Sequence, residues 1–174
     1  MKPDWIAVDW GTSSLRAWAM GPDGAVAEAA SADGMARLEP AEFEPALLAL
    51  VGDWLGDTAT PIVACGMVGA KQGWCEAPYA AVPCRPLDAA ACVRVPAIDR
   101  RIDMRIIPGL SQDHPADVMR GEETQISGFL AAEPDFAGTI CLPGTHTKWA
   151  SVADGIVSQF QTAPAEHSPP VRLR

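Results

Sequence analysis

Two short segments of this chain combine glycine, hydroxyl and basic residues in a way that suits a phosphate-binding turn. The first, within 5–18, contains Asp9-Trp10-Gly11-Thr12-Ser13 followed by Arg16. The second, within 139–150, contains Gly144-Thr145-His146-Thr147-Lys148. Glycine lets the backbone approach phosphate oxygens closely, while turn amides and hydroxyls donate hydrogen bonds to them. We therefore expect the two turns to face each other and to hold one polyphosphate from two sides.

Strands should position both turns, because apolar residues flank each one and an Asp-Gly hairpin follows, at Asp23-Gly24 and at Asp154-Gly155. The copies are not equivalent. Asp9 ends the first strand, where it could hold a metal ion through water, whereas Pro143 precedes the second glycine. The alternative is that both segments are ordinary hairpin turns, since short motifs match by chance.

Composition narrows the class of protein. A length of 174 residues with 48% apolar content is enough for one packed domain or slightly more. The net charge of -9 argues against nucleic-acid binding, which needs a basic face. No leader or apolar run of about 20 residues is visible, so we expect a cytoplasmic protein that does not bind membranes. The five cysteines lack C-x-x-C spacing and are expected to be reduced thiols.

Periodicity predicts the elements around the turns. Strands are expected at 4–9, 15–20, 25–30, 61–65 and 104–107, and amphipathic helices at 41–55 and 121–132. The segment 66–96 is rich in Gly, Pro, Trp and Cys, and a loop of that length usually lines a site.

The order of these elements resembles that of the actin-like ATPase and sugar kinase superfamily. More narrowly, the sequence motifs resemble those of the 2-dehydro-3-deoxygalactonokinase family. The stretches that carry this resemblance are Asp9-Trp10-Gly11-Thr12, Gly66-Met67-Val68-Gly69-Ala70-Lys71-Gln72-Gly73-Trp74, Glu76-Ala77-Pro78-Tyr79, Ile107-Pro108-Gly109-Leu110, Asp117-Val118-Met119-Arg120-Gly121-Glu122-Glu123-Thr124-Gln125 and Leu142-Pro143-Gly144-Thr145-His146-Thr147-Lys148-Trp149.

The resemblance implies an α/β fold of the ribonuclease-H-like kind. Residues 1–135 would form the first lobe, 136–160 the start of a second lobe, and 161–174 a disordered or frame-shifted tail of a truncated family member. It also implies ATP-dependent phosphorylation of the 6-hydroxyl of 2-dehydro-3-deoxy-galactonate, with Mg²⁺ as cofactor. The partners would be ATP and the sugar acid, and a homo-oligomer stays open.

Roles for the two turns follow from the superfamily. The first turn would hold the β- and γ-phosphates and hydrated magnesium, and the second turn the other side of the nucleotide. The residues are Asp9, Gly11, Thr12, Ser13 and Arg16 in the first turn, and Gly144, Thr145, His146 and Lys148 in the second. Alternatively, Arg16 pairs with a surface acid, and His146 is structural.

The remaining roles are a base and a sugar-acid site. Glu122 or Glu123 would accept the hydroxyl proton and be catalytic with Asp9, and Asp117 is the next candidate; alternatively, both glutamates only complement the helix dipole. A keto-deoxy acid presents a carboxylate, which favours cations. The predicted substrate-binding residues are Lys71, Gln72, Trp74, Tyr79 and Arg120. The alternatives are a solvated loop for Lys71 and core packing for the two aromatic residues.

Two rival functions stay open at this point. The first is an exopolyphosphatase-like hydrolase on the same scaffold, in which water replaces the sugar hydroxyl. The second is an inactive remnant that binds a sugar acid or a protein partner.

Overall fold

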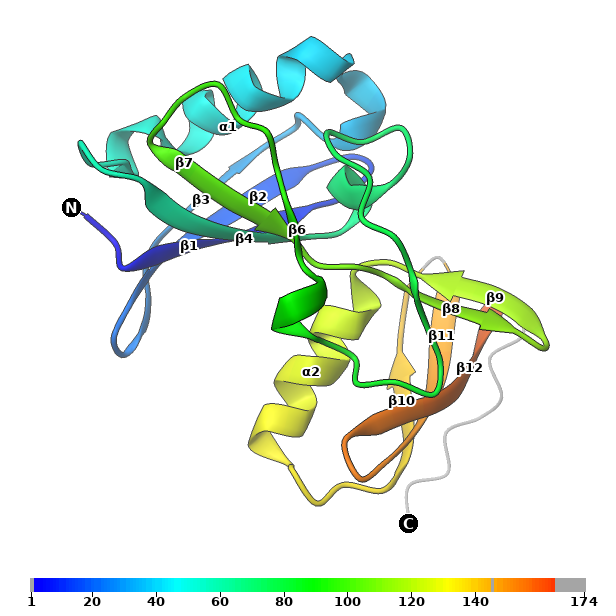
Figure 1. Cartoon of the computed structure of the whole chain (residues 1–174). Helices are drawn as coiled ribbons and strands as arrows, with labels where there is room; N and C mark the ends of the chain where they lie inside the picture. The colour runs from blue at the N-terminus through cyan, green and yellow to red at the C-terminus, as the bar shows by residue number, and fades with distance from the viewer. Residues whose placement is uncertain (1, 145, 165–174) are drawn as a thin grey trace. The chain divides into compact units, whose positions relative to one another are not determined.

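The computed structural model describes residues 2–144 and 146–164. The chain divides into two units (Figure 1). Unit 1 consists of residues 1–78 and 88–109, and unit 2 of residues 79–87 and 110–174. Each unit has its own hydrophobic core, so each is described by itself.

Unit 1 is built on a six-stranded mixed sheet of order β3-β2-β1-β4-β7-β6. Its strands are β1 (Trp5–Trp10), β2 (Leu15–Gly21), β3 (Gly24–Ser31), β4 (Thr60–Cys65), β6 (Val93–Arg94) and β7 (Ile102–Ile106). The parallel pairs are β1 with β4 and β4 with β7, and the other neighbours are antiparallel. The first three strands form a meander because tight turns connect them.

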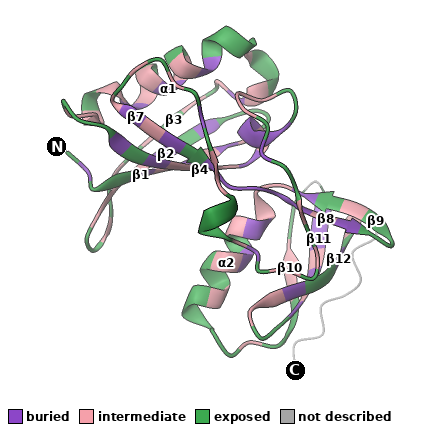
Figure 2. Ribbon diagram, viewed as in Figure 1, coloured by how far each residue is buried: buried purple, intermediate pink, exposed green. Residues whose placement is uncertain are grey.

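One helix packs on this sheet (Figure 1). Helix α1 (Phe43–Val51) buries Phe43, Leu47 and Val51, whose spacing of four residues places them on one face. Along β1 and β4, buried positions alternate with more exposed ones (Figure 2). The buried residues of the sheet and of α1 therefore form one core.

Unit 2 contains two three-stranded sheets and one helix. One sheet has the order β5-β8-β9 and the other β10-β11-β12. The strands are β5 (Ala80–Ala81), β8 (Leu110–Asp113), β9 (Ala116–Met119), β10 (Gly138–Leu142), β11 (His146–Ala153) and β12 (Ile156–Pro164). Helix α2 (Glu122–Ala132) contributes Ile126 to a core with residues of both sheets.

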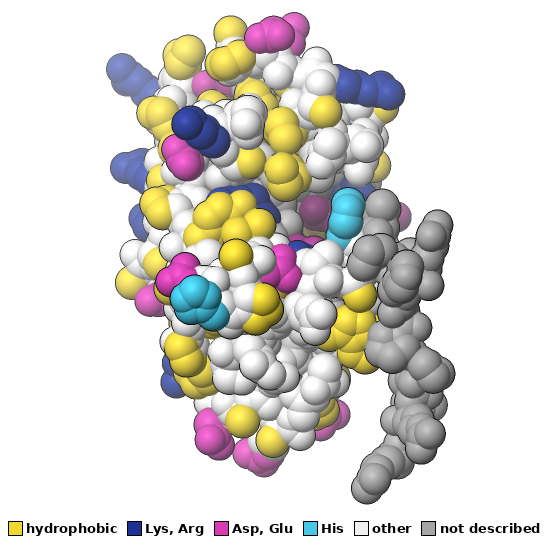
Figure 3. Space-filling view, turned by 90° about the vertical axis from the view of Figure 1, so that its right-hand side faces the viewer, with side chains coloured by type: hydrophobic (Ala, Val, Ile, Leu, Met, Phe, Trp, Pro, Cys, Tyr) yellow, Lys and Arg dark blue, Asp and Glu magenta, His cyan; other side chains and the backbone are white. Residues whose placement is uncertain are grey.

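Short 3-10 helices complete the chain, at Met35–Arg37, Pro40–Glu42, Gly52–Trp54, Met67–Gly69 and Ala89–Ala91. On the face shown in Figure 3, acidic, basic and apolar side chains are interspersed. Within the part of the chain that the structure describes, no helix combines the length and apolar character needed to cross a membrane.

The mixed α/β class and all the predicted strands and helices are confirmed. The predicted domain boundaries stay a prediction; in the structure, α2 shares its core with β11 and β12 and belongs to unit 2. Of the predicted tail, residues 161–164 belong to β12, which pairs with β11 as far as Pro164. The rest of the predicted tail, 165–174, lies outside the described residues. The hairpin of β8 and β9 was not predicted.

Candidate functional site

The first predicted turn joins β1 to β2 and has a fixed backbone. The amide of Gly11 donates to the carbonyl of Ser14 at 3.0 Å, which closes the turn. Thr12 and Ser13 lie exposed at its tip. The turn therefore presents hydroxyl groups on a rigid backbone, as phosphate binding requires.

A second segment supports this turn from behind. The amides of Met35 and Ala36 donate to the turn carbonyls at 2.9 and 3.0 Å. A Cβ at Gly34 would lie 2.2 Å from the carbonyl carbon of Ser13, so only glycine fits there. Sequence reasoning missed Gly34, although the pattern Asp33-Gly34 gave a turn signal.

Asp9 and Arg16 are directly opposite each other on β1 and β2, and their side chains form an ion pair. The side chains are 32% and 54% exposed, respectively. This is the alternative stated for Arg16 above, a pairing with a nearby acid. The pair lies beside the turn, because Asp9 precedes Gly11 by two residues.

Asp9 is the predicted ligand of a metal ion. Across residues 2–144 and 146–164, no three His, Cys, Asp or Glu side chains gather into a group that could hold a metal. Mg²⁺ commonly keeps several waters and binds through one or two carboxylates plus substrate phosphates. The single, partly exposed carboxylate of Asp9 suits this mode of Mg²⁺ binding, whereas it could not form a metal site from protein ligands alone.

Gly66 lies against the end of β1. Because β4 runs parallel to β1, with Asp9 opposite Cys65, the residue after β4 adjoins Asp9. The φ of Gly66 is 93°, and an added Cβ would lie 2.7 Å from the carbonyl oxygen of Trp10 and 3.4 Å from Oδ1 of Asp9. The left-handed conformation and this close approach both require glycine. The Gly66 motif therefore begins beside the acid of the first turn.

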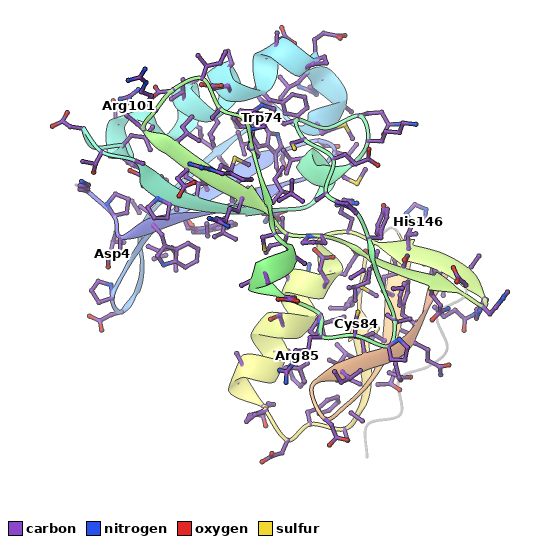
Figure 4. All side chains as sticks on the ribbon, in the orientation of Figure 1. Asp4, Trp74, Cys84, Arg85, Arg101 and His146 are labelled. Carbon is purple, nitrogen blue, oxygen red and sulfur yellow. The ribbon has the colours of Figure 1, made fainter. Side chains whose placement is uncertain are left out.

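The loop after Gly66 carries three predicted substrate-binding residues. Lys71 and Gln72 are exposed. Trp74 instead packs in the core, with its ring centroid 6.4 Å from that of Phe43 and 6.1 Å from that of Trp10 (Figure 4). Trp74 also lines a largely apolar cavity of about 470 Å³ together with Leu48 and other residues of unit 1. Core packing, the alternative stated for Trp74, is thus present in the structure, and its sugar contact stays a prediction.

In unit 2, the two candidate bases at the start of α2 have different environments. Glu123 is fully buried, and its Oε2 accepts a hydrogen bond from the amide of Gly121 at 2.7 Å. Glu122 is partly exposed and accepts from the amide of Arg120 at 3.0 Å. Burial raises the pKa of the Glu123 carboxyl from 4.5 to about 7, because desolvation outweighs its hydrogen bonds.

Arg120 and Tyr79 form the second half of the predicted substrate set. The guanidinium carbon of Arg120 lies 4.3 Å from the ring centroid of Tyr79, which is a cation–π contact. Tyr79 is exposed, and Arg120 precedes the two glutamates. Unit 2 therefore places the aromatic ring of Tyr79 against Arg120, which precedes the buried acid Glu123 in the same short segment.

Lys148, whose predicted role as a phosphate ligand stays a prediction, is engaged by acceptors of its own unit. Its side chain is only 7% exposed, and its ammonium donates to Oδ1 of Asp117 at 3.1 Å. The other acceptors are the carbonyl of Val118 and the hydroxyl of Thr162. Three donors thus meet three acceptors within unit 2. The physical reason is the pairing of β11 with β12 and its packing against β9, which sequence reasoning did not foresee.

The rest of the second turn lies at the surface. His146, labelled in Figure 4, is exposed, and so is Gly144. The hydroxyl of Thr147 donates to the carbonyl of Gly144 at 3.3 Å. Thr145, another predicted phosphate ligand, lies outside the described residues. The predicted approach of Gly11 to Gly144 stays a prediction, since the two glycines belong to different units.

Comparison with known proteins places the chain among its relatives. A profile of the 2-keto-3-deoxy-galactonokinase family matches residues 9–165. The chain belongs to this family. The resemblance inferred from the sequence is thereby confirmed.

Individual members of the family agree. The chain is 45% identical over 163 residues to a protein of Rhizobium meliloti (strain 1021) named "Probable 2-dehydro-3-deoxygalactonokinase", covering 91% of this chain and 52% of the relative. It is 36% identical over 169 residues to the 2-dehydro-3-deoxygalactonokinase of Escherichia coli (strain K12), covering 93% and 54%. The chain spans about half the length of these relatives.

A solved structure supports the fold of the family. It is a crystal structure of a Sinorhizobium meliloti protein assigned provisionally as a 2-dehydro-3-deoxygalactonokinase, with a TM-score of 0.80 and 42% identity. The match covers 91% of this chain and 52% of that one. The segments of the family that this chain contains include both candidate turns and the start of α2.

Proposed function

We propose that this chain carries the first phosphate turn, the second turn and the base of an ATP-dependent kinase. The substrate would be 2-dehydro-3-deoxy-galactonate, phosphorylated on its 6-hydroxyl. The family match over residues 9–165 supports the reaction class. The strand order of unit 1, with its antiparallel meander and two parallel strands, supports a ribonuclease-H-like lobe.

The observation that carries the proposal is the buried carboxyl of Glu123. Phosphoryl transfer needs a group that accepts the hydroxyl proton as the new bond forms. Such a base works best when its pKa lies near the operating pH, which is the condition that burial creates for Glu123. Asp117 is a poorer base, because Thr162, Lys148 and Val118 donate to it and hold its pKa below the ordinary value.

The nucleotide would be held mainly by the first turn. The exposed hydroxyls of Thr12 and Ser13 are free to face phosphate oxygens, and Gly11 permits their close approach. Arg16 would contribute a guanidinium, which suits phosphate oxygens. Asp9 would hold hydrated Mg²⁺, which supplies positive charge against the phosphates. In the second turn, we assign contacts to Gly144, Thr145 and His146, but not to Lys148.

The sugar acid would be held through its carboxylate. Arg120 beside Tyr79 offers a planar cation, and Lys71 with Gln72 offers exposed donors in unit 1. Tyr79 would cover the apolar side of the sugar chain, and it already stacks on the guanidinium that would bind the carboxylate. Trp74 is left out of the proposal because it packs against Phe43 and Trp10.

The test is an amide NMR titration of the 174-residue chain with MgATP and, separately, with 2-dehydro-3-deoxy-galactonate. We expect MgATP to shift the amides of Gly11, Thr12 and Ser13, and the sugar acid to shift those of Arg120 and Glu123. Two matched variants, Glu123→Gln and Glu122→Gln, each replace one carboxyl group by an amide at neighbouring positions, so the second serves as the control for the first.

Mass spectrometry of the same samples then distinguishes the alternatives. Sugar-acid phosphate that depends on Glu123 but not on Glu122 supports the proposal. ATP or polyphosphate hydrolysis without the sugar acid would indicate the exopolyphosphatase-like reaction instead. If MgATP at millimolar concentration does not bind, the proposed nucleotide site is contradicted. If the sugar acid does not bind, the proposed sugar-acid site is contradicted.

A further inference from the structure

We propose that Lys148 is a positioning residue, which anchors the segment 117–123 to β11 and β12 and thereby fixes the candidate base. The functional meaning of this anchor rests on the function proposed above. The anchor itself rests on the contacts of Lys148, Asp117 and Thr162 alone.

The three side chains connect three strands. Lys148 is the third residue of β11, Asp117 lies on β9 and Thr162 on β12. The carboxylate of Asp117 accepts from Lys148 Nζ at 3.1 Å, from the amide of Thr162 at 2.7 Å and from the hydroxyl of Thr162 at 2.8 Å. The amide of Val118 donates to the same carboxylate at 2.8 Å. A buried charge pair with this many partners has one strongly preferred geometry.

The contacts lie where backbone pairing between the two sheets of unit 2 is missing. Strands β9 and β12 belong to different sheets. Side chains bridge them instead, and Gln112 on β8 makes a second bridge. Its amide nitrogen donates to the carbonyl of Phe160 at 3.1 Å, and the amide of Phe160 donates back at 2.8 Å. These polar side chains therefore join the two sheets, in addition to the backbone bridge between Cys84 and Val157 and the apolar core that both sheets share.

The chain leaves this anchor and reaches the candidate base within six residues. Asp117 and Val118 are fixed by Lys148, and Arg120 and Gly121 follow directly. The amides of Arg120 and Gly121 donate to the carboxylates of Glu122 and Glu123. Loss of the anchor should therefore loosen the two hydrogen bonds that orient these acids.

The same cation is tied to the second turn. Lys148 follows Gly144 by four residues, and its backbone pairs with Leu142 across that turn. Lys148 thus connects the strand that follows the second turn to the segment that carries the candidate base. To bind a phosphate directly, the ammonium of Lys148 would have to give up its three acceptors, so such a contact is unfavourable.

The test compares Lys148→Met with Val152→Ala in the 174-residue chain, by amide hydrogen exchange. Methionine keeps the apolar stem and removes the ammonium. Val152 is a buried core residue of the same strand, outside the anchor. In Lys148→Met, we expect the amides of Arg120 and Gly121 to exchange at least tenfold faster relative to that of Val157. In Val152→Ala, all three should accelerate together.

Equal acceleration of the three amides in Lys148→Met would overturn the anchor, because it would show only a general loss of stability. Should Lys148→Met fail to fold, Thr162→Val tests the same point, since it removes one hydroxyl and leaves both charges. The same tenfold relative acceleration is expected.

Ligand titrations separate this inference from the proposed function. Where the parent binds the sugar acid, Lys148→Met should weaken binding at least tenfold more than Val152→Ala. A parent that binds no sugar acid would contradict the proposed function, while the exchange data still decide on the anchor. Tripolyphosphate is the probe for a direct role. A shift of the Lys148 Nζ signal that accompanies loss of its contact with Asp117 would overturn the positioning role.

Discussion

Substitution of Glu123 by glutamine should change how the stability of unit 2 depends on pH. The pKa of this carboxyl is about 7 in the folded chain and near 4.5 when exposed. The folded state therefore binds the proton more tightly than the unfolded state. Its contribution to stability is complete below about pH 4.5 and is lost as the pH rises to about 7.

The magnitude follows from the difference in pKa. A difference of about 2.5 corresponds to about 3 kcal/mol in the free energy of unfolding, at about 1.4 kcal/mol per pKa unit. Glutamine keeps an acceptor for the amide of Gly121 but does not titrate. The variant should therefore become more stable than the parent as the pH rises, by about 3 kcal/mol at pH 7.5.

Trp149 permits this measurement on unit 2 alone, because the other five tryptophans lie in unit 1. In chains labelled with 5-fluorotryptophan, the ¹⁹F signal that disappears in Trp149→Phe reports unfolding of unit 2 by urea. The parent, Glu123→Gln and Glu122→Gln are compared at pH 4.5, 5.5, 6.5 and 7.5. If the free energies of unfolding of the parent and Glu123→Gln follow parallel curves against pH, the raised pKa of Glu123 is refuted. If the curve becomes flat in Glu122→Gln instead, the raised pKa belongs to Glu122.

Three further predictions follow from the site. Asp9→Asn should change stability by less than about 1 kcal/mol, since its partner Arg16 is half exposed, but should weaken MgATP binding at least tenfold in calorimetry. Gly66→Ala should destabilise unit 1 by about 2 kcal/mol or more in urea unfolding, because of its φ and its contact with Trp10, whereas Gly52→Ala, with φ of -56° and open space, should not destabilise it. Asp117→Asn should lower the free energy of unfolding of unit 2 by about 3–5 kcal/mol at neutral pH, measured by the Trp149 signal. The difference from the parent should shrink below about pH 4, because the lowered pKa of Asp117 gives the parent stability that is lost only in acid.

The elements of this fold were predictable wherever local patterns agree with tertiary packing. The meander of β1 to β3 has turn residues at both ends, and α1 has apolar residues at helical spacing. The hairpin of β8 and β9 was missed because each strand has only four residues, with mixed polarity. Its buried residues, Leu110 and Met119, are recognisable only once α2 and β12 pack against them.

The candidate site was predictable in residue type more than in role. The sequence shows Gly11, Thr12 and Ser13 as a turn, and the structure has them there. It gives no sign that Lys148 is buried, because its partner Asp117 lies 31 residues away and a lysine in a strand normally faces solvent. Gly34 and Gly66 were missed as supports for a related reason, since each contacts backbone that is distant in sequence.

The assignment of the base finally depends on how burial and hydrogen bonding compete at two acids in one segment. Both carboxyls are desolvated. Asp117 accepts from the ammonium of Lys148 and from donors on Val118 and Thr162, so its charged form is stabilised and its pKa is lowered. Glu123 is buried more deeply and accepts fewer hydrogen bonds, so desolvation prevails and its pKa rises to about 7. A group that anchors must keep its charge, whereas a group that accepts a proton must exchange it near neutral pH. The same segment therefore supplies an anchor at its beginning and the candidate base at its end.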